Sequence, residues 1–190
     1  MNSGEVKQRL SELLTQKRVE HSKRVAECAV KLAKIYNCDE KKAYIAGMVH
    51  DAAKCLNLEQ VYEYVDKYEI YLDPIEDGNR ALSHSVVGAS IVRYEFGIED
   101  EDIINSVKYH TTGRAEMSLL EKIIYLADLL EDGRVIPHIE ELRELAYSGQ
   151  LDKAMIESFN QTLTFVIAND NLIHPRSVEA RNYLLREIDK

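Results

Sequence analysis

Apolar residues recur along most of the chain at spacings of three and four, the period that places them on one face of an α-helix. Asn, Asp, Gly and Pro, which end helices or form turns, lie in the breaks between these segments. The segment Tyr68–Leu72 resembles a short strand, but it is isolated and flanked by charge, so we interpret it as a helix end and loop. We predict ten helices: Val6–Leu14, Val19–Tyr36, Lys41–Lys54, Leu58–Tyr68, Ala81–Phe96, Asp102–His110, Leu119–Leu130, Ile139–Ala146, Leu151–Ala168 and Val178–Ile188.

The composition is that of one globular domain. The chain has 190 residues, of which 45% are hydrophobic and 30% are charged, with only 8 Gly and 3 Pro. We therefore predict an all-α, single-domain helical bundle of about ten helices over residues 1–190. The formal net charge is −9, and no Lys/Arg cluster is present, which argues against polymeric nucleic acid as a partner. A small anionic substrate stays open, because bound cations can dominate the field of a pocket.

The N-terminal segment and the cysteines indicate the cellular compartment in which we expect the protein. Met1–Leu14 is polar, without the basic and apolar regions of a signal peptide, and no stretch approaches 18 apolar residues. Cys28, Cys38 and Cys55 are odd in number and lack Cys-x-x-Cys spacing. We expect a cytoplasmic protein with free thiols, no disulfide and no membrane partner.

Several histidines are placed on the apolar faces of the predicted helices. Within Val19–Tyr36, stepping back four residues from the apolar position Val25 reaches His21. In the next helix His50 shares a face with Ala46, and the following Asp51 lies about 100° round the helix. The same test gives inward positions to three further residues: His84, His110 and Asp128.

These inward polar residues favour a metal site. A single His on an apolar face is more often a hydrogen-bonded core residue, so no one of them is evidence alone. However, an ionised carboxylate such as Asp128, between Leu126 and Leu129, is costly to bury unless it is paired or coordinates a metal. Several imidazoles and carboxylates pointing into one interior predict a metal centre there.

The order of these residues resembles a known family. A His (His21), a later His-Asp pair (His50 and Asp51) and a distant Asp (Asp128) form the pattern of the HD-domain metal phosphohydrolases. The resemblance to the bacterial symmetrical bis(5′-nucleosyl)-tetraphosphatases covers about residues 17–185, with a departure at Asp132, where that family often has Pro. The stretches that carry it are Ala46–Lys54, Tyr109–Arg114, Leu120–Asp128, Gly133–Arg134, Ile173–Arg176 and Glu179–Asn182.

This resemblance implies an HD-type helical bundle with a metal site at its centre. It implies cleavage of diadenosine tetraphosphate (Ap4A) into two ADP by a metal-bound hydroxide at two divalent metal ions. Iron is the first expectation, with manganese or another divalent ion as alternatives, since imidazole and carboxylate ligands suit all of these. One metal would be held by four residues, namely His21, His50, Asp51 and Asp128. The other would be held by His84 and His110, with Asp51 as the bridge.

A polyphosphate also needs cationic groups. Arg18 lies three residues before His21, and Lys54 lies four residues after His50, which would place both near the metals. The resemblance implies Asp51, Lys54 and Arg134 as catalytic residues. For the arginines a plain surface charge is the alternative, and for Thr112 a turn beside Gly113. The predicted substrate-binding set is Arg18, His21, Lys54, His84, His110, Thr111, Thr112, Arg114, Asp128, Arg134, Asn171, His174 and Arg176.

Three other functions are alternatives to dinucleoside tetraphosphate hydrolysis. An HD-type phosphohydrolase can act on mononucleotides, a di-iron site on an HD fold can act as an oxidoreductase, and a non-catalytic nucleotide-binding protein can retain the same fold. The last would predict missing metal ligands, and each of the six is present. The cations Lys54, Arg114 and Arg134 favour phosphate chemistry over the oxidoreductase. The oligomeric state stays open, a homodimer included.

Overall fold

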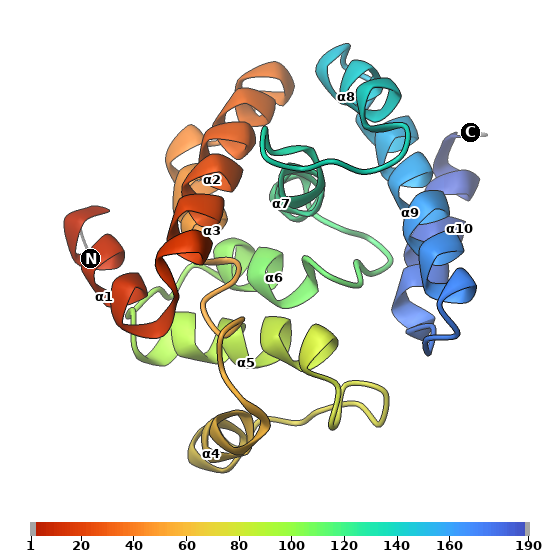
Figure 1. Cartoon of the computed structure of the whole chain (residues 1–190). Coiled ribbons are helices and arrows are strands. Elements are labelled where there is room, and N and C mark those ends of the chain that lie inside the picture. Colours follow the sequence, from red (N-terminus) through yellow and green to blue (C-terminus); the bar gives the residue numbers. More distant parts are fainter. Residues whose placement is uncertain (1–2, 189–190) are drawn as a thin grey trace.

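The computed structural model describes residues 3–188, and within this range the chain forms ten α-helices and no strand (Figure 1). The predicted all-α fold is therefore confirmed, and Tyr68–Leu72 is a helix end followed by a loop. None of the helices in this part of the chain combines the length and the apolar character that crossing a bilayer requires. The helices are α1 Ser3–Leu13, α2 Gln16–Tyr36, α3 Glu40–Val49, α4 Leu58–Tyr68, α5 Arg80–Tyr94, α6 Glu101–Tyr109, α7 Leu119–Leu130, α8 Ile139–Tyr147, α9 Leu151–Ala168 and α10 Pro175–Ile188.

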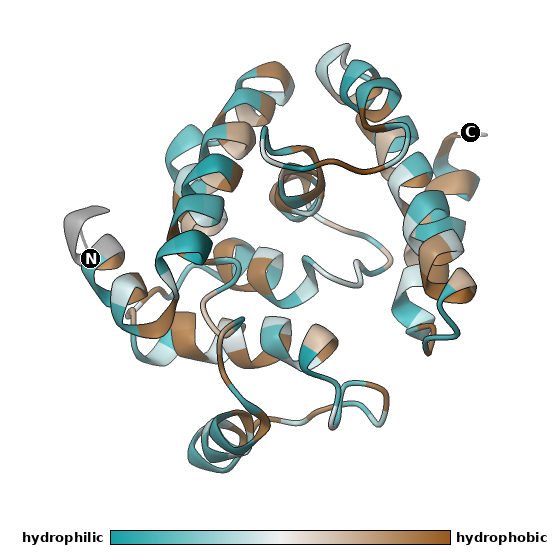
Figure 2. Cartoon of the chain, viewed as in Figure 1, coloured by the Kyte–Doolittle hydropathy of each residue, from teal (hydrophilic) through white to brown (hydrophobic). Residues whose placement is uncertain are grey.

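The helix α7 lies at the centre of the bundle. It packs against α2, α3 and α6 on one side and against α8 and α9 on the other, and Figure 1 shows it end-on between these groups. Its sequence is apolar on most of its circumference, as expected for a helix that is surrounded. The outer helices instead carry a hydrophilic face and a hydrophobic face (Figure 2). A polar residue on α7 therefore lies in the interior unless it is near a helix end.

Short polar side chains determine where several helices begin. Asp39 accepts hydrogen bonds from the backbone N–H groups at the start of α3, and Asp100 does the same for α6. Asn57 and Gln60 form a reciprocal capping box at the start of α4. Ser118 accepts from the backbone N–H of Glu121 at the start of α7. These side chains satisfy N–H groups that have no partner within the helix, and they fix the entry of each helix.

Several helix boundaries differ from the sequence prediction, and the largest difference is at the end of α3. The helix predicted over Lys41–Lys54 ends at Val49, because the following backbone forms tight turns with bonds from Ala52 to Val49 and from Lys54 to Asp51. The apolar spacing continues through these turns, since Ala52 and its neighbour are buried, so periodicity alone extended the helix. The consequence is that His50 and Asp51 are both buried instead of pointing about 100° apart on a helix.

The last helix begins earlier than predicted. We expected it to start at Val178, but α10 begins at Pro175, whose fixed φ and missing N–H suit the first position of a helix. Arg176, which we expected in a loop, therefore lies in the first turn of α10. His174 immediately precedes the helix and is buried.

A glycine allows α2 and α3 to approach closely. A Cβ on Gly47 would lie 2.6 Å from the Cα and 2.9 Å from the backbone N of Ala26, distances that require a backbone to move. This approach brings the start of α2, which carries His21, near the end of α3, which carries His50. The absence of a side chain at Gly47 is thus a requirement of the packing.

We expect Gly47→Ala to lower the free energy of unfolding by about 1–3 kcal/mol, because the added methyl group overpacks the contact between α2 and α3. Gly88→Ala is the matched control, since a Cβ there meets Val107 and Ala53 at ordinary distances of 3.6 Å and more. In the control the removal of a helical glycine should leave stability unchanged or raise it. Urea unfolding of both variants measures the difference, and equal stability would contradict the account.

Candidate metal centre

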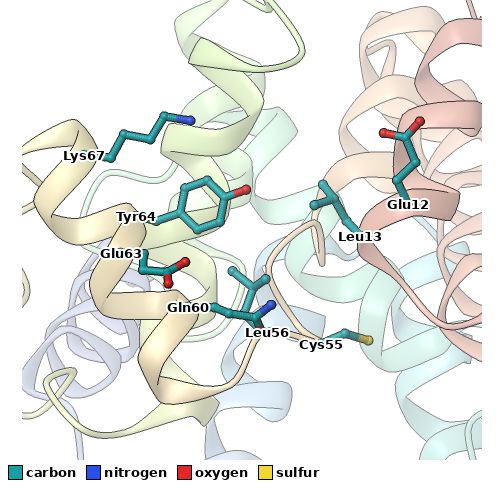
Figure 3. A pocket seen from close by; sticks show the side chains of 8 residues that line it. All are labelled: Glu12, Leu13, Cys55, Leu56, Gln60, Glu63, Tyr64 and Lys67. Atoms are coloured by element: carbon teal, nitrogen blue, oxygen red, sulfur yellow. The ribbon is translucent and has the colours of Figure 1, made fainter.

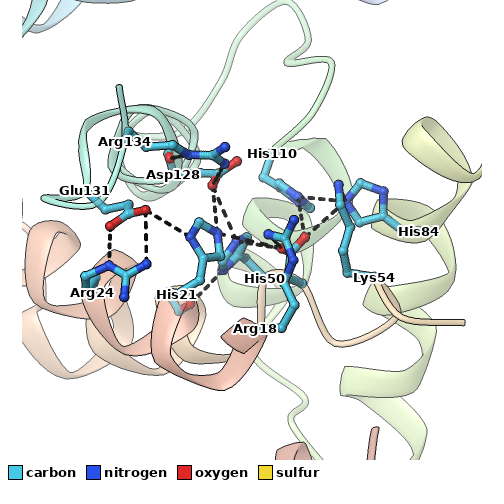
Figure 4. Close-up of polar contacts among 12 residues, drawn as sticks. Arg18, His21, Arg24, His50, Lys54, His84, His110, Asp128, Glu131 and Arg134 are labelled. Atoms are coloured by element: carbon cyan, nitrogen blue, oxygen red, sulfur yellow. Dashed lines mark hydrogen bonds and ion pairs between the residues drawn. The ribbon is translucent and has the colours of Figure 1, made fainter. Parts of the chain in front are cut away.

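The structure brings the six predicted metal ligands together between α2, α3, α5, α6 and α7 (Figure 4). Each comes from a helix or from the residues directly after one: His21 from the start of α2, and His50 and Asp51 from the end of α3. His84 comes from α5, His110 directly follows α6, and Asp128 comes from α7. Five of the six are buried, and Asp128 is partly exposed.

One oxygen of Asp51 faces the first group of ligand atoms. Asp51 Oδ2 lies 3.7 Å from His21 Nε2 and 3.6 Å from His50 Nε2. Asp128 Oδ1 completes this group, at 3.0 Å from His21 Nε2 and 3.8 Å from His50 Nε2. The ligand atoms of His21, His50 and Asp51 lie within 4.8 Å of one another, close enough to share one cation, and Asp128 Oδ1 lies beside them.

The other oxygen of Asp51 faces the second group. Asp51 Oδ1 lies 3.2 Å from His84 Nε2 and 3.6 Å from His110 Nε2. The two imidazole nitrogens are 3.2 Å apart. A single carboxylate thus stands between two sets of ligand atoms and presents one oxygen to each.

Hydrogen bonds at the far side of each imidazole determine which nitrogen faces the centre. The Nδ1 atoms of His50, His84 and His110 lie 2.8, 3.1 and 2.7 Å from the backbone carbonyl oxygens of Gly47, Arg80 and Val107 respectively. A carbonyl oxygen can only accept, so each Nδ1 carries the proton. His21 Nδ1 donates in the same way to the carboxylate of Glu131, at 3.2 Å. In the neutral ring, each Nε2 is consequently a lone-pair acceptor.

Two of the acceptor atoms at the centre have no donor within the described part of the chain. Among the described residues, His21 Nε2 and His50 Nε2 are buried and have no hydrogen-bond partner, although carboxylate oxygens lie near both. Lone pairs and ionised carboxylates that point at a common space repel one another unless a cation lies there. The donor set of imidazole nitrogen and carboxylate oxygen fits a divalent transition metal in each group.

The pKa values of four of the ligands are lowered, by neighbouring groups at the carboxylates and by burial at the imidazoles. Burial alone would raise the pKa of Asp51 and of Asp128, but the surrounding imidazoles, together with Arg134 beside Asp128, hold both pKa values well below the usual range. Burial lowers the pKa of His50 and the pKa of His84 from 6.5 to about 4 in each case. At neutral pH the carboxylates are ionised and these two imidazoles are neutral, which is the protonation state that binds metals.

These shifts predict how the metal-free chain responds to acid. The unfolded state binds protons at His50 and His84 near pH 6.5, whereas the folded state resists protonation until about pH 4. The free energy of unfolding should therefore fall as the pH falls from 6.5 towards 4, by up to about 3 kcal/mol for each imidazole. Urea unfolding of chelator-treated protein across this range measures the slope. His84→Gln should flatten it, and a pH-independent stability would contradict the expectation.

Three of the predicted cationic groups lie beside the ligands (Figure 4). Arg18 Nη1 donates to Asp51 Oδ2 at 2.9 Å, and Arg134 Nη2 donates to Asp128 Oδ1 at 2.6 Å. Lys54 Nζ lies 3.2 Å from His84 Nε2. The Arg18 and Arg134 side chains are about one-third exposed, at 32% and 35%. They therefore lie between the buried ligands and the solvent, where an incoming anion would pass.

Most of the other predicted substrate contacts are engaged with partners outside the six ligands. The hydroxyl of Thr111 pairs with Ser85 at 3.0 Å, and the buried Thr112 uses its backbone carbonyl to accept from Ser177. Two buried carboxylates hold the two remaining arginines: Glu121 binds Arg114 through two bonds of 2.8 and 2.7 Å, and Glu76 binds Arg176 at 2.6 Å, with His174 Nε2 3.4 Å away. Asn171 is exposed. Substrate roles for these residues stay predictions.

Three buried carboxylates that bind His21 or arginine side chains were not predicted from the sequence. Glu131 contacts His21 and also Arg24, while Glu121 and Glu76 neutralise arginines that we had considered as phosphate contacts or as plain surface charges. Glu121 lies on the same side of α7 as Asp128, seven residues earlier, so helical spacing contained a signal for one of them. Glu76 lies in a loop, where no periodicity indicates burial.

The departure at Asp132 does not disturb the turn after α7. The Asp132 side chain is exposed and lies 3.7 Å from Lys31. Its neighbours form the turn instead, since Gly133 N donates to Glu131 Oε2 at 2.6 Å and Arg134 N donates to the Glu131 carbonyl at 2.9 Å. The turn returns Arg134 to the end of α7, beside Asp128.

A separate hollow of about 310 Å³ lies between α1 and α4 (Figure 3). Its wall carries two carboxylates, Glu12 and Glu63, and one ammonium group, Lys67. None of the predicted site residues lines it. The metal centre is therefore not part of this hollow.

Comparison with known proteins agrees with the geometry of the centre. The HD domain family model matches residues 18–133. The chain is 41% identical to a symmetrical bis(5′-nucleosyl)-tetraphosphatase of Staphylococcus aureus (strain NCTC 8325 / PS 47), over 96% of this chain and 94% of the relative. It is 36% identical to a protein of the same name from Bacillus subtilis (strain 168), over 97% and 98%.

A solved structure is similar over almost the whole chain. It is the crystal structure of a predicted HD superfamily hydrolase involved in NAD metabolism from Clostridium acetobutylicum. The two chains are 42% identical and superpose with a TM-score of 0.93, over 98% of each. The fold and the sequence similarity therefore point to the same family.

Proposed function

The chain belongs to the HD-domain family and to the group of symmetrical bis(5′-nucleosyl)-tetraphosphatases within it, and on this premise we propose that it hydrolyses dinucleoside tetraphosphates such as Ap4A into two nucleoside diphosphates. The similarity extends over nearly the full length of relatives that carry this name. We further propose that residues 1–190 act as one domain and that the partner is this small molecule. The second candidate substrate is a mononucleotide.

The observation that carries the proposal is the position of Asp51. One of its oxygens faces His21 and His50, and the other faces His84 and His110. A carboxylate shared in this way is the ligand that two neighbouring cations require. We propose two divalent ions at this centre, with iron as the first expectation and manganese as an alternative.

When bound, two such cations lower the pKa of a water molecule and neutralise charge on the attacked phosphate and on the leaving phosphate. The residues of the chain provide the surroundings for this chemistry. Arg18 and Arg134 present guanidinium groups that can each donate two hydrogen bonds to phosphate oxygens. Lys54 adds a point charge beside His84. Because these cations stand at the exposed side of the ligands, they orient a polyphosphate chain against the centre.

The two arginines are held by carboxylates that are also proposed metal ligands. Arg18 and Arg134 are paired with Asp51 and Asp128 in this structure. An ionised ligand and a neighbouring guanidinium stabilise each other when no phosphate is present. With cations bound, Asp51 and Asp128 would serve as metal ligands, and the two guanidinium groups beside them would be available to phosphate oxygens. The proposed site thus keeps its charges compensated in both states.

A panel of substrates at equal concentration tests the proposed class. We expect the metal-loaded protein to hydrolyse Ap4A at least about 100-fold more efficiently, in kcat/KM, than ATP, dGTP or AMP. This preference corresponds to about 2.7 kcal/mol of additional transition-state binding. Comparable efficiency on a mononucleotide would favour the second candidate. A protein that contains metal but releases no phosphate or nucleotide from any member of the panel would contradict phosphohydrolase function.

A further inference from the structure

A buried carboxylate lies behind the metal centre, at the residue that follows α7. Glu131 is only 2% exposed. Its Oε1 lies 3.2 Å from His21 Nδ1, and its Oε2 accepts hydrogen bonds from Arg24 Nε and from Gly133 N (Figure 4). Burial alone would raise the pKa of Glu131, but the bonds from Arg24, the Gly133 amide and His21 hold it below the usual range. The carboxylate therefore accepts from each of these three partners, of which Arg24 is also its ion-pair partner.

His21 depends on a side chain for its orientation, unlike the other imidazoles of the centre. His50, His84 and His110 each donate Nδ1–H to a carbonyl oxygen three or four residues earlier in their own segment. His21 instead reaches a residue 110 positions later in the chain. A charged acceptor also makes an imidazole a better donor to a metal than a neutral carbonyl does. Glu131 thus determines both the direction and the basicity of His21 Nε2.

The same carboxylate shapes the turn that carries Arg134. Its Oε2 binds the Gly133 amide at 2.6 Å, and a side chain at Gly133 would meet both Glu131 and Arg24 at 2.9 Å. The next residue, Arg134, donates from Nε to the Asp128 carbonyl at 2.9 Å and from Nη2 to Asp128 Oδ1. The carboxylate of Glu131 therefore holds both the proposed ligand His21 on α2 and the turn that carries Arg134 after α7.

We infer that Glu131 is a positioning residue of the first metal group, which orients His21 as a ligand and fixes the turn of Arg134. This inference rests on the proposed function only in assuming that a divalent ion binds His21, His50, Asp51 and Asp128. Glu131 itself binds His21 at Nδ1, the nitrogen opposite the one that faces the candidate ligands. A purely structural role, as the ion-pair partner of Arg24 and the end of α7, is the alternative.

Glu121 provides a matched control. It lies on α7 as well, is equally buried at 1% exposure, and binds Arg114 through two hydrogen bonds. Within the described part of the chain, its hydrogen bonds and ion pair involve Arg114 and Ser118 and none of the six candidate ligands. Removing the charge of Glu121 therefore costs a buried ion pair of the same kind without touching His21. If the Glu121 and Glu131 variants lose stability equally, that loss reflects the broken ion pair. If only the Glu131 variants bind metal more weakly, the weakening reflects the positioning of His21.

The test titrates metal-free full-length protein with Mn²⁺ and follows free Mn²⁺ by electron paramagnetic resonance. We expect Glu131→Gln to weaken one of two binding events by about 10–100-fold. Glu131→Ala should weaken the same event further, because it removes the acceptor as well as the charge, whereas Glu121→Gln should bind as the unmodified protein does. Thermal unfolding of each metal-free variant shows that it is folded before the titration.

Unchanged Mn²⁺ binding in Glu131→Gln and in Glu131→Ala would overturn the inference. Equal weakening in Glu121→Gln would also overturn it, since the effect would then follow from lost stability. These outcomes are distinct from a failure of the proposed function, because they are read from Mn²⁺ binding and not from Ap4A. If the unmodified protein binds Mn²⁺ but leaves Ap4A intact, the substrate proposal fails while the role of Glu131 is still decided by the titration.

Discussion

Replacing Asp51 by asparagine should reduce kcat for Ap4A hydrolysis by on the order of 10⁴-fold, or about 5.5 kcal/mol of transition-state stabilisation. The amide can offer one oxygen but no second anionic oxygen, so it cannot serve both ligand groups. Asp51 Oδ1 and Oδ2 lie within 3.2–3.7 Å of four imidazole nitrogens, two from each group. Steady-state rates with Ap4A, at saturating metal, measure the loss.

Metal analysis of the same variant shows whether the loss has the expected cause. We expect Asp51→Asn to retain less than the full complement of metal, because one ligand of each group is weakened. Asp102→Asn is a suitable control, since this carboxylate accepts from Ser118 at the surface of the bundle and touches none of the ligands. Substantial turnover by Asp51→Asn at saturating metal would contradict the shared-carboxylate assignment.

Removal of the metals by a chelator should abolish hydrolysis and also destabilise the fold. Without cations, acceptor atoms at the centre face one another at 3.0–3.8 Å, with no protein donor for His21 Nε2 or His50 Nε2 within the described residues. A ligand that binds only the folded state stabilises it by about 4 kcal/mol at a thousand times its Kd. Thermal unfolding with and without Mn²⁺ or Fe²⁺, under anaerobic conditions, measures this difference.

The return of activity on adding metal back distinguishes this effect from damage by the chelator. Mn²⁺ or Fe²⁺ should restore both the melting temperature and the rate, whereas Ca²⁺, which prefers oxygen ligands, should restore neither fully. If the chelated protein hydrolyses Ap4A at the original rate, the metal centre has no part in the reaction. If the metals restore stability but no rate, they serve the fold alone.

Much of the fold followed from apolar periodicity. The ten predicted segments correspond to the ten helices of the described range, and the inward positions of His21, His84 and His110 follow from the stripes on their helices. The His50 position was obtained by extending a helix that in fact ends at Val49. Lys54 lies near the centre as expected, but on a turn instead of the predicted helical face. Spacing of apolar residues cannot distinguish a helix from tight turns that bury the same side chains.

Other features of the centre depend on contacts between distant segments, which periodicity does not describe. Glu131 meets His21 across 110 residues, and Glu76 meets Arg176 across 100. The orientation of Asp51 towards two ligand groups results from the turn after α3 and the close approach of α2 at Gly47. Each of these requires the tertiary arrangement, because a carboxylate in a loop carries the same sequence signal whether it is exposed or buried.

The measurement that tests the central claim most directly is the identity of the products from Ap4A. Protein purified anaerobically, with its metal content determined, is incubated with Ap4A and the nucleotides are separated by chromatography. The account predicts about two divalent ions per chain and ADP as the sole nucleotide product, two molecules for each Ap4A consumed. AMP and ATP in equal amounts would contradict the symmetrical cut, and intact Ap4A in the presence of bound metal would contradict the proposed activity.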